Sequence, residues 1–382
     1  MPRIENKPQT RCTAPDEVSG PWIEVDLAAV ARNIGRIHGW CGRPLMPVVK
    51  ANAYGHGLVP VARRLAREEA VAGLCVGNVR EALALRRAGL TLPVLNLGPC
   101  TPAEAEAIVE RDIGQSVFTE AVAVLDRAAA AQGRVAAVHV KIDTGLGRIG
   151  VPHAQAAAFI FHTARLKHVR IAGVFTTLSE DRAFDAIQLE RFAAALAEPA
   201  RAGIPLGQRH AASSAAVLDA PDAALDLVRP GITVLGYYPS AAEHRRRRID
   251  LQPALTLKAR VVCVKHLEAG APVGYHRAYR APGEETLVTG AIGYSDGYPV
   301  QLADRAACLI GGRRHPLVAA VSANHICVRS AGGEIQAGDE IVLYGRQGDA
   351  VIDLQDIAEA TGRSVYNLLA RLNPDLPRFY HE

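Results

Sequence analysis

Short apolar runs alternate with longer amphipathic segments along the chain from Trp22 to about Tyr238. The runs have the length of buried strands, and the segments between them repeat apolar residues at every third or fourth position, as helices do. Strands connected in series through helices must form a parallel sheet, because parallel neighbours need a crossover connection. The predicted strands cover residues 22–25, 45–49, 73–76, 93–97, 115–118, 135–142, 171–176, 208–212 and 233–235.

About eight such units fit a closed (β/α)8 barrel of the TIM type, an α/β fold whose active site lies at the C-terminal ends of its strands. The alternative is a doubly wound open sheet, which often carries a G-x-G-x-x-G phosphate loop after its first strand. No such motif follows residues 22–25. The sequence therefore favours the barrel.

The pattern changes after the arginine run at residues 245–248. Residues 255–267 alternate imperfectly at period two, and further short strands separated by Gly-rich turns follow. One helix is predicted at residues 354–363, ending at Gly362. We therefore expect a loose tail at residues 1–20, a barrel at 21–240 and a C-terminal, mostly-β domain at 241–382.

Composition excludes several classes of protein. The chain has 43 Lys+Arg against 39 Asp+Glu, a net charge of +4, which is too small for a nucleic-acid-binding surface. No apolar stretch approaches the length of a membrane span, and the N-terminus lacks the apolar core of a signal peptide. The seven cysteines are scattered without a C-x-x-C pair, so neither a disulfide framework nor a metal site is expected. We expect a cytoplasmic enzyme.

The most informative segment is Val-Val-Lys-Ala-Asn-Ala-Tyr-Gly-His-Gly at residues 48–57. Lys50 follows an apolar strand, which predicts that its amine lies over the mouth of the barrel. An amine removed from water there is a candidate for a Schiff base. Tyr54 lies four residues on and can donate a hydrogen bond to an anion.

This segment resembles the cofactor-lysine motif of the alanine racemase family, fold type III enzymes that use pyridoxal 5'-phosphate (PLP). The resemblance extends from Trp22 to Tyr380 and implies a (β/α)8 barrel followed by a C-terminal β domain. It also includes Lys-Ile-Asp-Thr-Gly-Leu-Gly-Arg-Ile-Gly at 141–150, Val-Arg-Pro-Gly-Ile at 228–232, Gly-Tyr at 274–275 and Gly-Tyr-Ser-Asp-Gly-Tyr at 293–298.

The resemblance implies an amino-acid racemase with two bases. Lys50 would hold PLP as an internal aldimine and act on one face of the substrate's Cα, while Tyr275 would act on the opposite face. One base removes the α-proton and the other returns one, which inverts the carbon. In the family this tyrosine reaches the barrel of the other subunit, so a homodimer is implied, with alanine as the default substrate.

The resemblance also implies the other ligands of PLP and substrate. Arg229 faces the pyridine nitrogen, and His210 is the partner of that arginine. Arg148 touches the PLP hydroxyl and the substrate carboxylate, and Lys141 stands where the family often carries a carbamylated lysine. The positions that hold the phosphate are Tyr54, Ser214, Gly231, Ile232 and Tyr366.

The chain departs from the family pattern on the substrate side. Thr177 replaces a histidine that supports the catalytic tyrosine, and a threonine cannot share an imidazole proton with the phenol. Ala323 and Asn324 replace a Met-Asp pair near the substrate carboxylate. Further departures are Val300 and Ala320 in place of arginines, Ser213 in place of an asparagine and Asn367 in place of a glutamate.

Three interpretations follow from these departures. The first is drift within an alanine racemase. The second is a PLP enzyme of the same fold that acts at Cα of a larger or modified amino acid, as an epimerase, decarboxylase or aldolase. The third is a PLP-binding protein without turnover.

Overall fold

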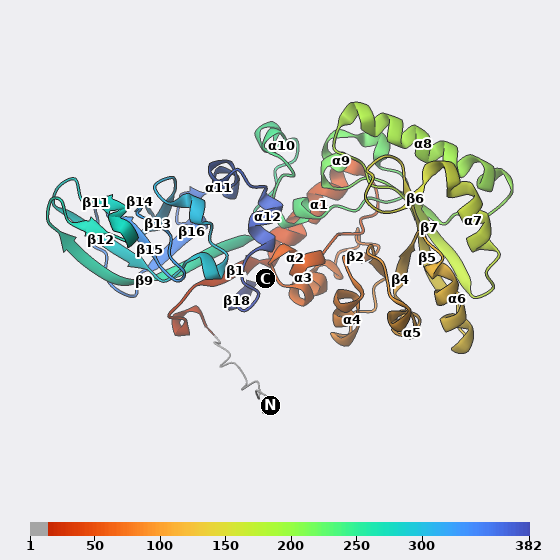
Figure 1. Ribbon diagram of the computed structural model, residues 1–382, viewed down its shortest axis with the longest axis horizontal. Coiled ribbons are helices and arrows are strands. Elements are labelled where there is room, and N and C mark those ends of the chain that lie inside the picture. The colour runs from red at the N-terminus through yellow and green to blue at the C-terminus, as the bar shows by residue number, and fades with distance from the viewer. Residues whose placement is uncertain (1–13) are drawn as a thin grey trace. The chain divides into compact units, whose positions relative to one another are not determined.

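The computed structural model describes residues 14–382, which form two compact units. One unit runs from Leu27 to Pro253, and the other combines the N-terminal segment up to Asp26 with Ala254–Glu382. In Figure 1 the first unit runs from red to green, and the C-terminal part of the second is teal to blue.

The first unit is built on a parallel sheet. The strands β2 (Leu74–Val76), β3 (Val94–Asn96), β4 (Gly114–Val117), β5 (Ala136–Asp143), β7 (Val169–Phe175) and β8 (Gln208–His210) pair in this order, all parallel. The short β6 (Val151–Pro152) pairs with β5.

Two segments close this sheet into a ring. Residues 44–49 make parallel bridges to both neighbours, through Leu45 to Val228 on one side and through Val48 to Cys75 of β2 on the other. Residues 226–230 in turn bond β8, where the amide of Asp226 donates to the Arg209 carbonyl. With the six strands on the path from β2 to β8, which leaves out β6, these segments make eight, the number that a (β/α)8 barrel requires. The predicted fold class is confirmed.

Helices connect the strands and lie outside the ring (Figure 1). Each longer helix buries the apolar residues that repeat at helical spacing, as Leu58, Val61 and Leu65 do in α3. The helices of this unit are α1 (Leu27–Cys41), α2 (Lys50–Tyr54), α3 (Leu58–Leu65), α4 (Val79–Arg87), α5 (Pro102–Glu110), α6 (Ala121–Ala131), α7 (Ala156–Ala164), α8 (Arg182–Arg201), α9 (Ser214–Asp219) and α10 (Ala241–Arg246).

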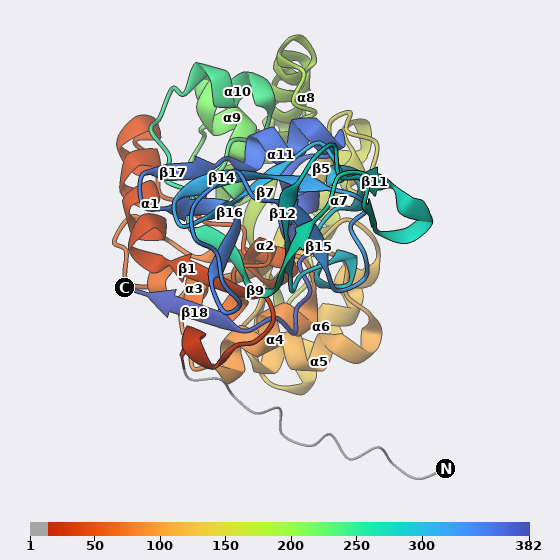
Figure 2. The same cartoon turned by 90° about the vertical axis from the view of Figure 1, so that its left-hand side faces the viewer.

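The second unit is mostly β, as predicted. The strands β9 (Leu255–Leu267), β12 (Glu285–Gly290), β15 (Ile326–Arg329), β14 (Arg313–Val318), β13 (Ala307–Ile310) and β16 (Glu340–Gln347) are antiparallel neighbours in this order. Because β16 also pairs with β9, they form a closed ring, which faces the viewer in Figure 2.

Shorter elements complete the second unit. The strands β10 (Pro272–Val273) and β11 (Tyr279–Arg280) form a hairpin, and β17 (Ala350–Ile352) extends the sheet beside β16. Two helices follow, α11 (Leu354–Thr361) and α12 (Val365–Ala370). The residue after α11 is Gly362 in a left-handed conformation, which confirms the predicted helix end.

The predicted barrel strand at residues 22–25 is wrong in its placement. It is a strand, β1 (Trp22–Asp26), but it pairs antiparallel with β9 and parallel with β18 (Arg378–His381) in the second unit. Lys258 of β9 forms a 3.0 Å ion pair with Glu24, and the Arg260 guanidinium lies over the Trp22 ring. Residues 44–49 therefore provide the first barrel strand.

The predicted strand at residues 233–235 is also wrong. These residues belong to a 3-10 helix, Ile232–Leu235, whose side chains are all buried. A short apolar run does not distinguish a buried strand from a buried helical turn, because neither shows a polar face. The last barrel strand is the preceding segment, residues 226–230.

The boundary between the units differs from the predicted position at residues 240 and 241. Residues 241–253 join the barrel unit because they bond its helices. Asn33 of α1 donates to the Gln252 carbonyl and accepts from the Gln252 amide, both at 2.9 Å, and Arg248 forms a 2.6 Å ion pair with Asp219.

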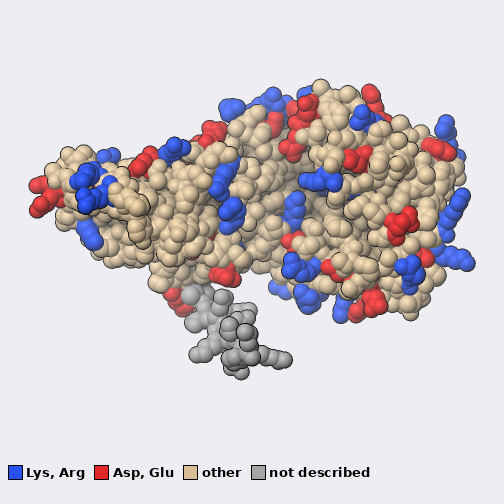
Figure 3. Space-filling view, viewed as in Figure 1, with Lys and Arg blue, Asp and Glu red and all other residues tan. Residues whose placement is uncertain are grey.

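The surface carries both signs of charge. On the face shown in Figure 3, Lys and Arg are interspersed with Asp and Glu, as the small net charge predicts. Among the described residues, no helix is long and apolar enough to cross a bilayer.

Candidate functional site

Lys50 lies where predicted, directly after the first barrel segment, and it begins an unusual turn. The next four residues, Ala51 to Tyr54, all have φ between 49° and 57°, in the left-handed region. Each non-glycine residue there costs about 1–2 kcal/mol, so surrounding contacts must hold the turn. Asn52 Oδ1 accepts from the Leu58 amide at 2.8 Å, and His56 Nδ1 donates to the Tyr54 carbonyl at 3.0 Å.

Four cationic side chains influence one another at the carboxyl ends of the barrel strands. Burial and the charge of Arg148 lower the pKa of the Lys50 amine. Burial, together with Arg148 and Arg229, lowers the pKa of Lys141 to about 8. A lowered pKa makes an amine available as a neutral base or nucleophile near neutral pH. A group of cations at a barrel mouth also favours an anionic ligand.

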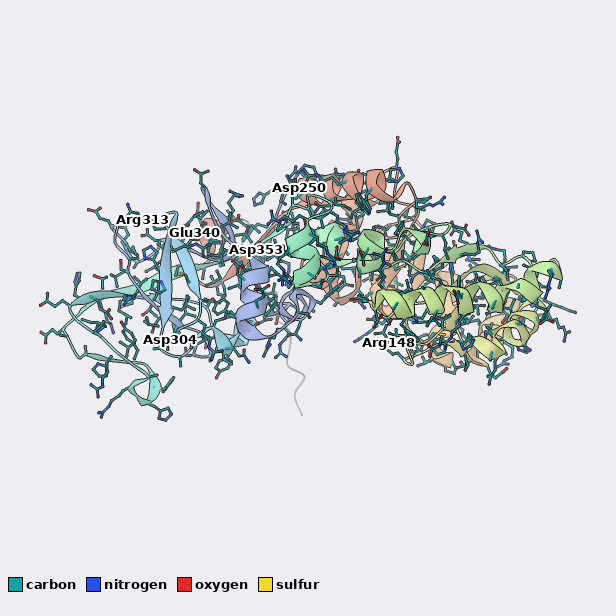
Figure 4. All side chains as sticks on the ribbon, turned by 90° about the horizontal axis from the view of Figure 1, so that it is seen from above. Arg148, Asp250, Asp304, Arg313, Glu340 and Asp353 are labelled. Carbon is teal, nitrogen blue, oxygen red and sulfur yellow. The ribbon has the colours of Figure 1, made fainter. Side chains whose placement is uncertain are left out.

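Arg148 lies in the loop after β5, where its side chain is exposed (Figure 4). Asp143 fixes this loop, because its Oδ1 accepts from the amides of Gly145 at 3.0 Å and Gly147 at 3.1 Å. The loop therefore has a defined course although the arginine itself reaches into solvent.

Four of the five residues predicted to hold phosphate lie in the barrel unit: Tyr54, Ser214, Gly231 and Ile232. Ser214 Oγ accepts from the Gly231 amide at 2.9 Å, and a Cβ placed on Gly231 would lie 2.9 Å from Tyr54 Oη. A side chain at that position would displace the Tyr54 hydroxyl. Burial raises the pKa of Tyr54, so its hydroxyl remains a neutral donor. Hydroxyl donors around a glycine, at the start of the 3-10 helix that begins with Ile232, fit the phosphate of PLP.

Arg229 is buried, and both Nη atoms of its guanidinium form hydrogen bonds. Its Nη2 donates to the carbonyls of Thr176 at 2.8 Å and Ala211 at 3.2 Å, and its Nη1 donates to His210 Nδ1 at 2.6 Å. The Phe175 ring stacks on His210 and lies 5.0 Å from the Arg229 Cζ. Burial lowers the pKa of Arg229 to about 10, so it remains a cation near neutral pH.

A second histidine extends this chain. The distance from His210 Nε2 to His139 Nδ1 is 2.9 Å. A guanidinium can only donate, so His210 Nδ1 accepts, its proton lies on Nε2, and His139 accepts in turn. Burial and the charge of Arg229 lower the pKa of His210 well below its usual value and that of His139 to about 4. Both imidazoles are therefore neutral near neutral pH.

A buried polar network supports the position of Thr177. Gln188 Nε2 donates to the Thr177 carbonyl and to Thr144 Oγ1, both at 3.2 Å, and Thr144 shares a 2.7 Å hydrogen bond with Thr176. The same Thr176 accepts from Arg229 through its carbonyl. This network therefore connects the loop after β7 to the arginine.

The sequence prediction missed His139, Thr144, Thr176 and Gln188. A signal existed for His139, because it precedes Lys141 by two residues on one strand and so points to the same side of the sheet. Gln188 gave no signal, since a single polar residue on a helix is ordinarily solvated.

The remaining predicted site residues belong to the other compact unit. Tyr275 follows Gly274, which has φ +77°, and its side chain is 74% exposed. Ala323 and Tyr366 are both half-buried, Tyr366 within α12. Among residues 14–382, no cluster of His, Cys, Asp or Glu could hold a metal ion.

Comparison with known proteins gives matches over nearly the whole chain. Residues 25–239 match the family model "Alanine racemase, N-terminal domain", and residues 254–380 match "Alanine racemase, C-terminal domain". The alanine racemase of Symbiobacterium thermophilum is 41% identical over 372 residues, which cover 96% of this chain and 98% of that protein. The alanine racemase of Desulfovibrio desulfuricans is 39% identical, with 94% and 98% covered.

Solved structures match as well. The alanine racemase of a D-cycloserine-producing Streptomyces lavendulae has a TM-score of 0.90 at 32% identity, covering 96% of this chain and 98% of that one. The histidine racemase of Leuconostoc mesenteroides has a TM-score of 0.87 at 28% identity, covering 97% and 99%.

Proposed function

Because the chain belongs to the alanine racemase family, we propose that it is a PLP-dependent isomerase that inverts Cα of a small amino acid, with alanine as its substrate. The observation that carries this proposal is the site in the barrel. It combines an amine of lowered pKa at Lys50, the Tyr54 hydroxyl close to Gly231, and a buried cation at Arg229. The scattered cysteines support a reducing, cytoplasmic location.

When bound, PLP withdraws electrons from the substrate and so makes its Cα–H bond acidic. Lys50 would hold the cofactor covalently through Nζ, as a Schiff base. The hydroxyls of Tyr54 and Ser214, with Gly231, Ile232 and Tyr366, would hold its phosphate. These roles are supported by the convergence of Tyr54, Ser214 and Gly231.

Arg229 would face the ring nitrogen of the cofactor. The Arg229 guanidinium remains charged and can only donate hydrogen bonds, and the neutral His210 behind it accepts one of them. A ring nitrogen that accepts from this guanidinium would stay unprotonated, which would weaken electron withdrawal and restrain side reactions such as transamination.

Two side chains would then move the proton. Lys50 would act on one face of Cα and Tyr275 on the other. Tyr275 is exposed on its own chain, which supports its supply to the barrel of a second copy in a homodimer. Arg148 and Ala323 would contact the substrate. The lowered pKa of Lys141, about 8, increases the fraction of neutral amine near neutral pH, which is the form that carbamylation needs.

The test measures α-deuterium uptake and chirality when the PLP-loaded protein is incubated with L- or D-alanine in D2O. We expect uptake with inversion from either enantiomer. Uptake without inversion, or only on a larger amino acid, would contradict alanine racemisation. Bound PLP without any exchange would contradict an enzymatic role.

Two substitutions test the assigned bases. Lys50→Ala should abolish the visible absorbance of covalently held cofactor and lower racemisation by at least about 1000-fold. Tyr275→Phe should lower racemisation by about 100- to 10,000-fold while PLP stays bound. Tyr279→Phe on the same hairpin is the matched control, because its hydroxyl bonds Glu285 instead. Normal racemisation by the Tyr275 variant would contradict the two-base assignment.

A further inference from the structure

Two neighbouring helices carry a glutamate at the same position, but the two carboxylates have different hydrogen-bond partners. Glu81 in α4 and Glu104 in α5 are each the third residue of their helix. A glutamate there ordinarily accepts a hydrogen bond from the backbone amide of its own cap residue. Glu104 does so, because Glu104 Oε2 accepts from the Thr101 amide at 2.8 Å.

The carboxylate of Glu81 is bonded outside its own helix. One oxygen accepts from the Gly77 amide at 2.9 Å, and the other accepts from the Ala51 amide at 2.7 Å. The N-terminus of α4 is capped by another residue, Asn78, whose side chain accepts from the Glu81 amide at 3.0 Å. Helix capping therefore does not account for where the Glu81 carboxylate lies.

Both amides that Glu81 binds adjoin Lys50. Ala51 follows Lys50 and is the first residue of the left-handed turn. Gly77 lies against the Lys50 side chain, since a Cβ on Gly77 would be 3.2 Å from Lys50 Cβ and 3.6 Å from Lys50 Cδ. The Glu81 carboxylate thus connects the backbone next to Lys50 with Gly77, on which the aliphatic part of the Lys50 side chain packs.

The left-handed turn explains why such a bond is needed. Alanine has no preference for positive φ, so the turn is held by its surroundings. The Ala51 amide is a donor at the strained end of the turn, and a carboxylate is the strongest acceptor that a protein can offer it. The negative charge also acts on the amine, because Glu81 raises the pKa of Lys50 against the effects of burial and Arg148.

We propose that Glu81 is a positioning residue for Lys50, holding the left-handed turn against the end of β2 and so fixing where Nζ takes up and returns a proton. This inference rests on the proposed racemase function, in which Lys50 is one of the two bases. Glu81 does not itself touch the reacting atoms.

The kinetic test compares Glu81→Gln and Glu81→Ala with the matched control Glu104→Gln in the PLP-loaded enzyme. Glutamine keeps one acceptor oxygen but turns an NH2 group toward the second amide. We expect kcat to fall about 10- to 100-fold for Glu81→Gln and further for Glu81→Ala, with KM changed less than about threefold. Glu104→Gln should keep kcat within about twofold of wild type. Equal kcat values for the Gln variants would overturn the proposal.

A second readout needs no turnover. The PLP-free protein is treated with an amine-acylating reagent at a series of pH values, and modification of Lys50 is quantified by peptide mass spectrometry, with the exposed Lys167 as internal reference. Removing the nearby negative charge favours the neutral amine, so the Lys50 profile should shift to lower pH in Glu81→Gln and stay in place in Glu104→Gln. An unshifted profile in Glu81→Gln would overturn the proposal.

The two readouts separate failure of this inference from failure of the proposed function. If wild-type protein racemises no amino acid, the proposed function is wrong, while the acylation profiles still test whether Glu81 acts on Lys50. If wild type racemises and Glu81→Gln matches Glu104→Gln in both assays, only the role of Glu81 is wrong.

Discussion

At the scale of single residues, the site depends on neutral imidazoles beside a buried cation. Arg229 donates to His210, and His210 donates to His139. A charge on either imidazole would add a second buried cation beside the guanidinium, which burial makes costly. The folded protein therefore excludes protons that the same histidines accept when the chain unfolds.

This exclusion predicts a pH-dependent stability. The pKa of His139 is about 4 in the folded chain and about 6.5 when unfolded, so between these values the unfolded state binds the extra proton. The free energy of unfolding should thus decrease as pH falls from 6.5 toward 4. In His139→Gln, which retains an acceptor for His210, the slope should be smaller by up to about 1.4 kcal/mol per pH unit.

Urea unfolding at pH 7, 6 and 5 measures this slope. The control His162→Gln removes an exposed imidazole from α7 and should leave most of the slope in place. Parallel curves for wild type and His139→Gln would show that His139 does not exclude a proton on folding.

At the scale of elements, a glycine can either lower or raise the stability of the fold, according to what surrounds it. Gly35 lies exposed inside α1, and a Cβ there would meet nothing within 4 Å. Gly236 ends the 3-10 helix Ile232–Leu235 with φ +90°, and a Cβ there would lie 1.9 Å from the Gln252 carbonyl oxygen. The first glycine weakens its helix, and the second allows the barrel unit to close on residues 241–253.

Replacing these two glycines with alanine should change the free energy of unfolding in opposite directions. Gly35→Ala should raise the free energy of unfolding by about 0.5–1 kcal/mol, because alanine loses less backbone entropy in a helix. Gly236→Ala should lower it by more than about 2 kcal/mol, because both φ and the close carbonyl forbid a side chain. Chemical denaturation measures both, and an unchanged stability in Gly236→Ala would contradict the argument.

At the scale of the whole molecule, the two proposed bases belong to different compact units. Lys50 lies in the barrel unit, and Tyr275 lies in the β unit, where it is exposed. If Tyr275 is supplied to a second copy of the chain, a chain lacking Lys50 and a chain lacking Tyr275 together form one intact site.

Coexpression of Lys50→Ala and Tyr275→Phe chains tests this arrangement. With equal amounts, half of the dimers are hybrids with one intact site of two, so about one quarter of wild-type activity is expected. Each variant alone should be inactive by comparison. If Lys50 and Tyr275 of the same chain acted on one substrate, mixing the variants would restore no activity. A monomer in sedimentation would also contradict the homodimer.

The sequence predicted most of the fold, because hydrophobic periodicity is local. The strands and helices of the barrel unit follow their apolar spacing, and Gly362 ends α11 as its position indicated. The segment at residues 48–57 was also enough to identify Lys50 and Tyr54 as candidates, since strand ends in a parallel barrel meet on one face.

Only the tertiary structure decided the features that depend on distant partners. Residues 22–26 have an ordinary strand pattern, and nothing in it shows that β9 and β18, more than 200 residues away, would pair with them. The left-handed turn after Lys50 is likewise invisible in the run Ala-Asn-Ala-Tyr, because its φ angles are imposed from outside. Part of that restraint comes from a glutamate thirty residues away, whose carboxylate accepts from the Ala51 amide.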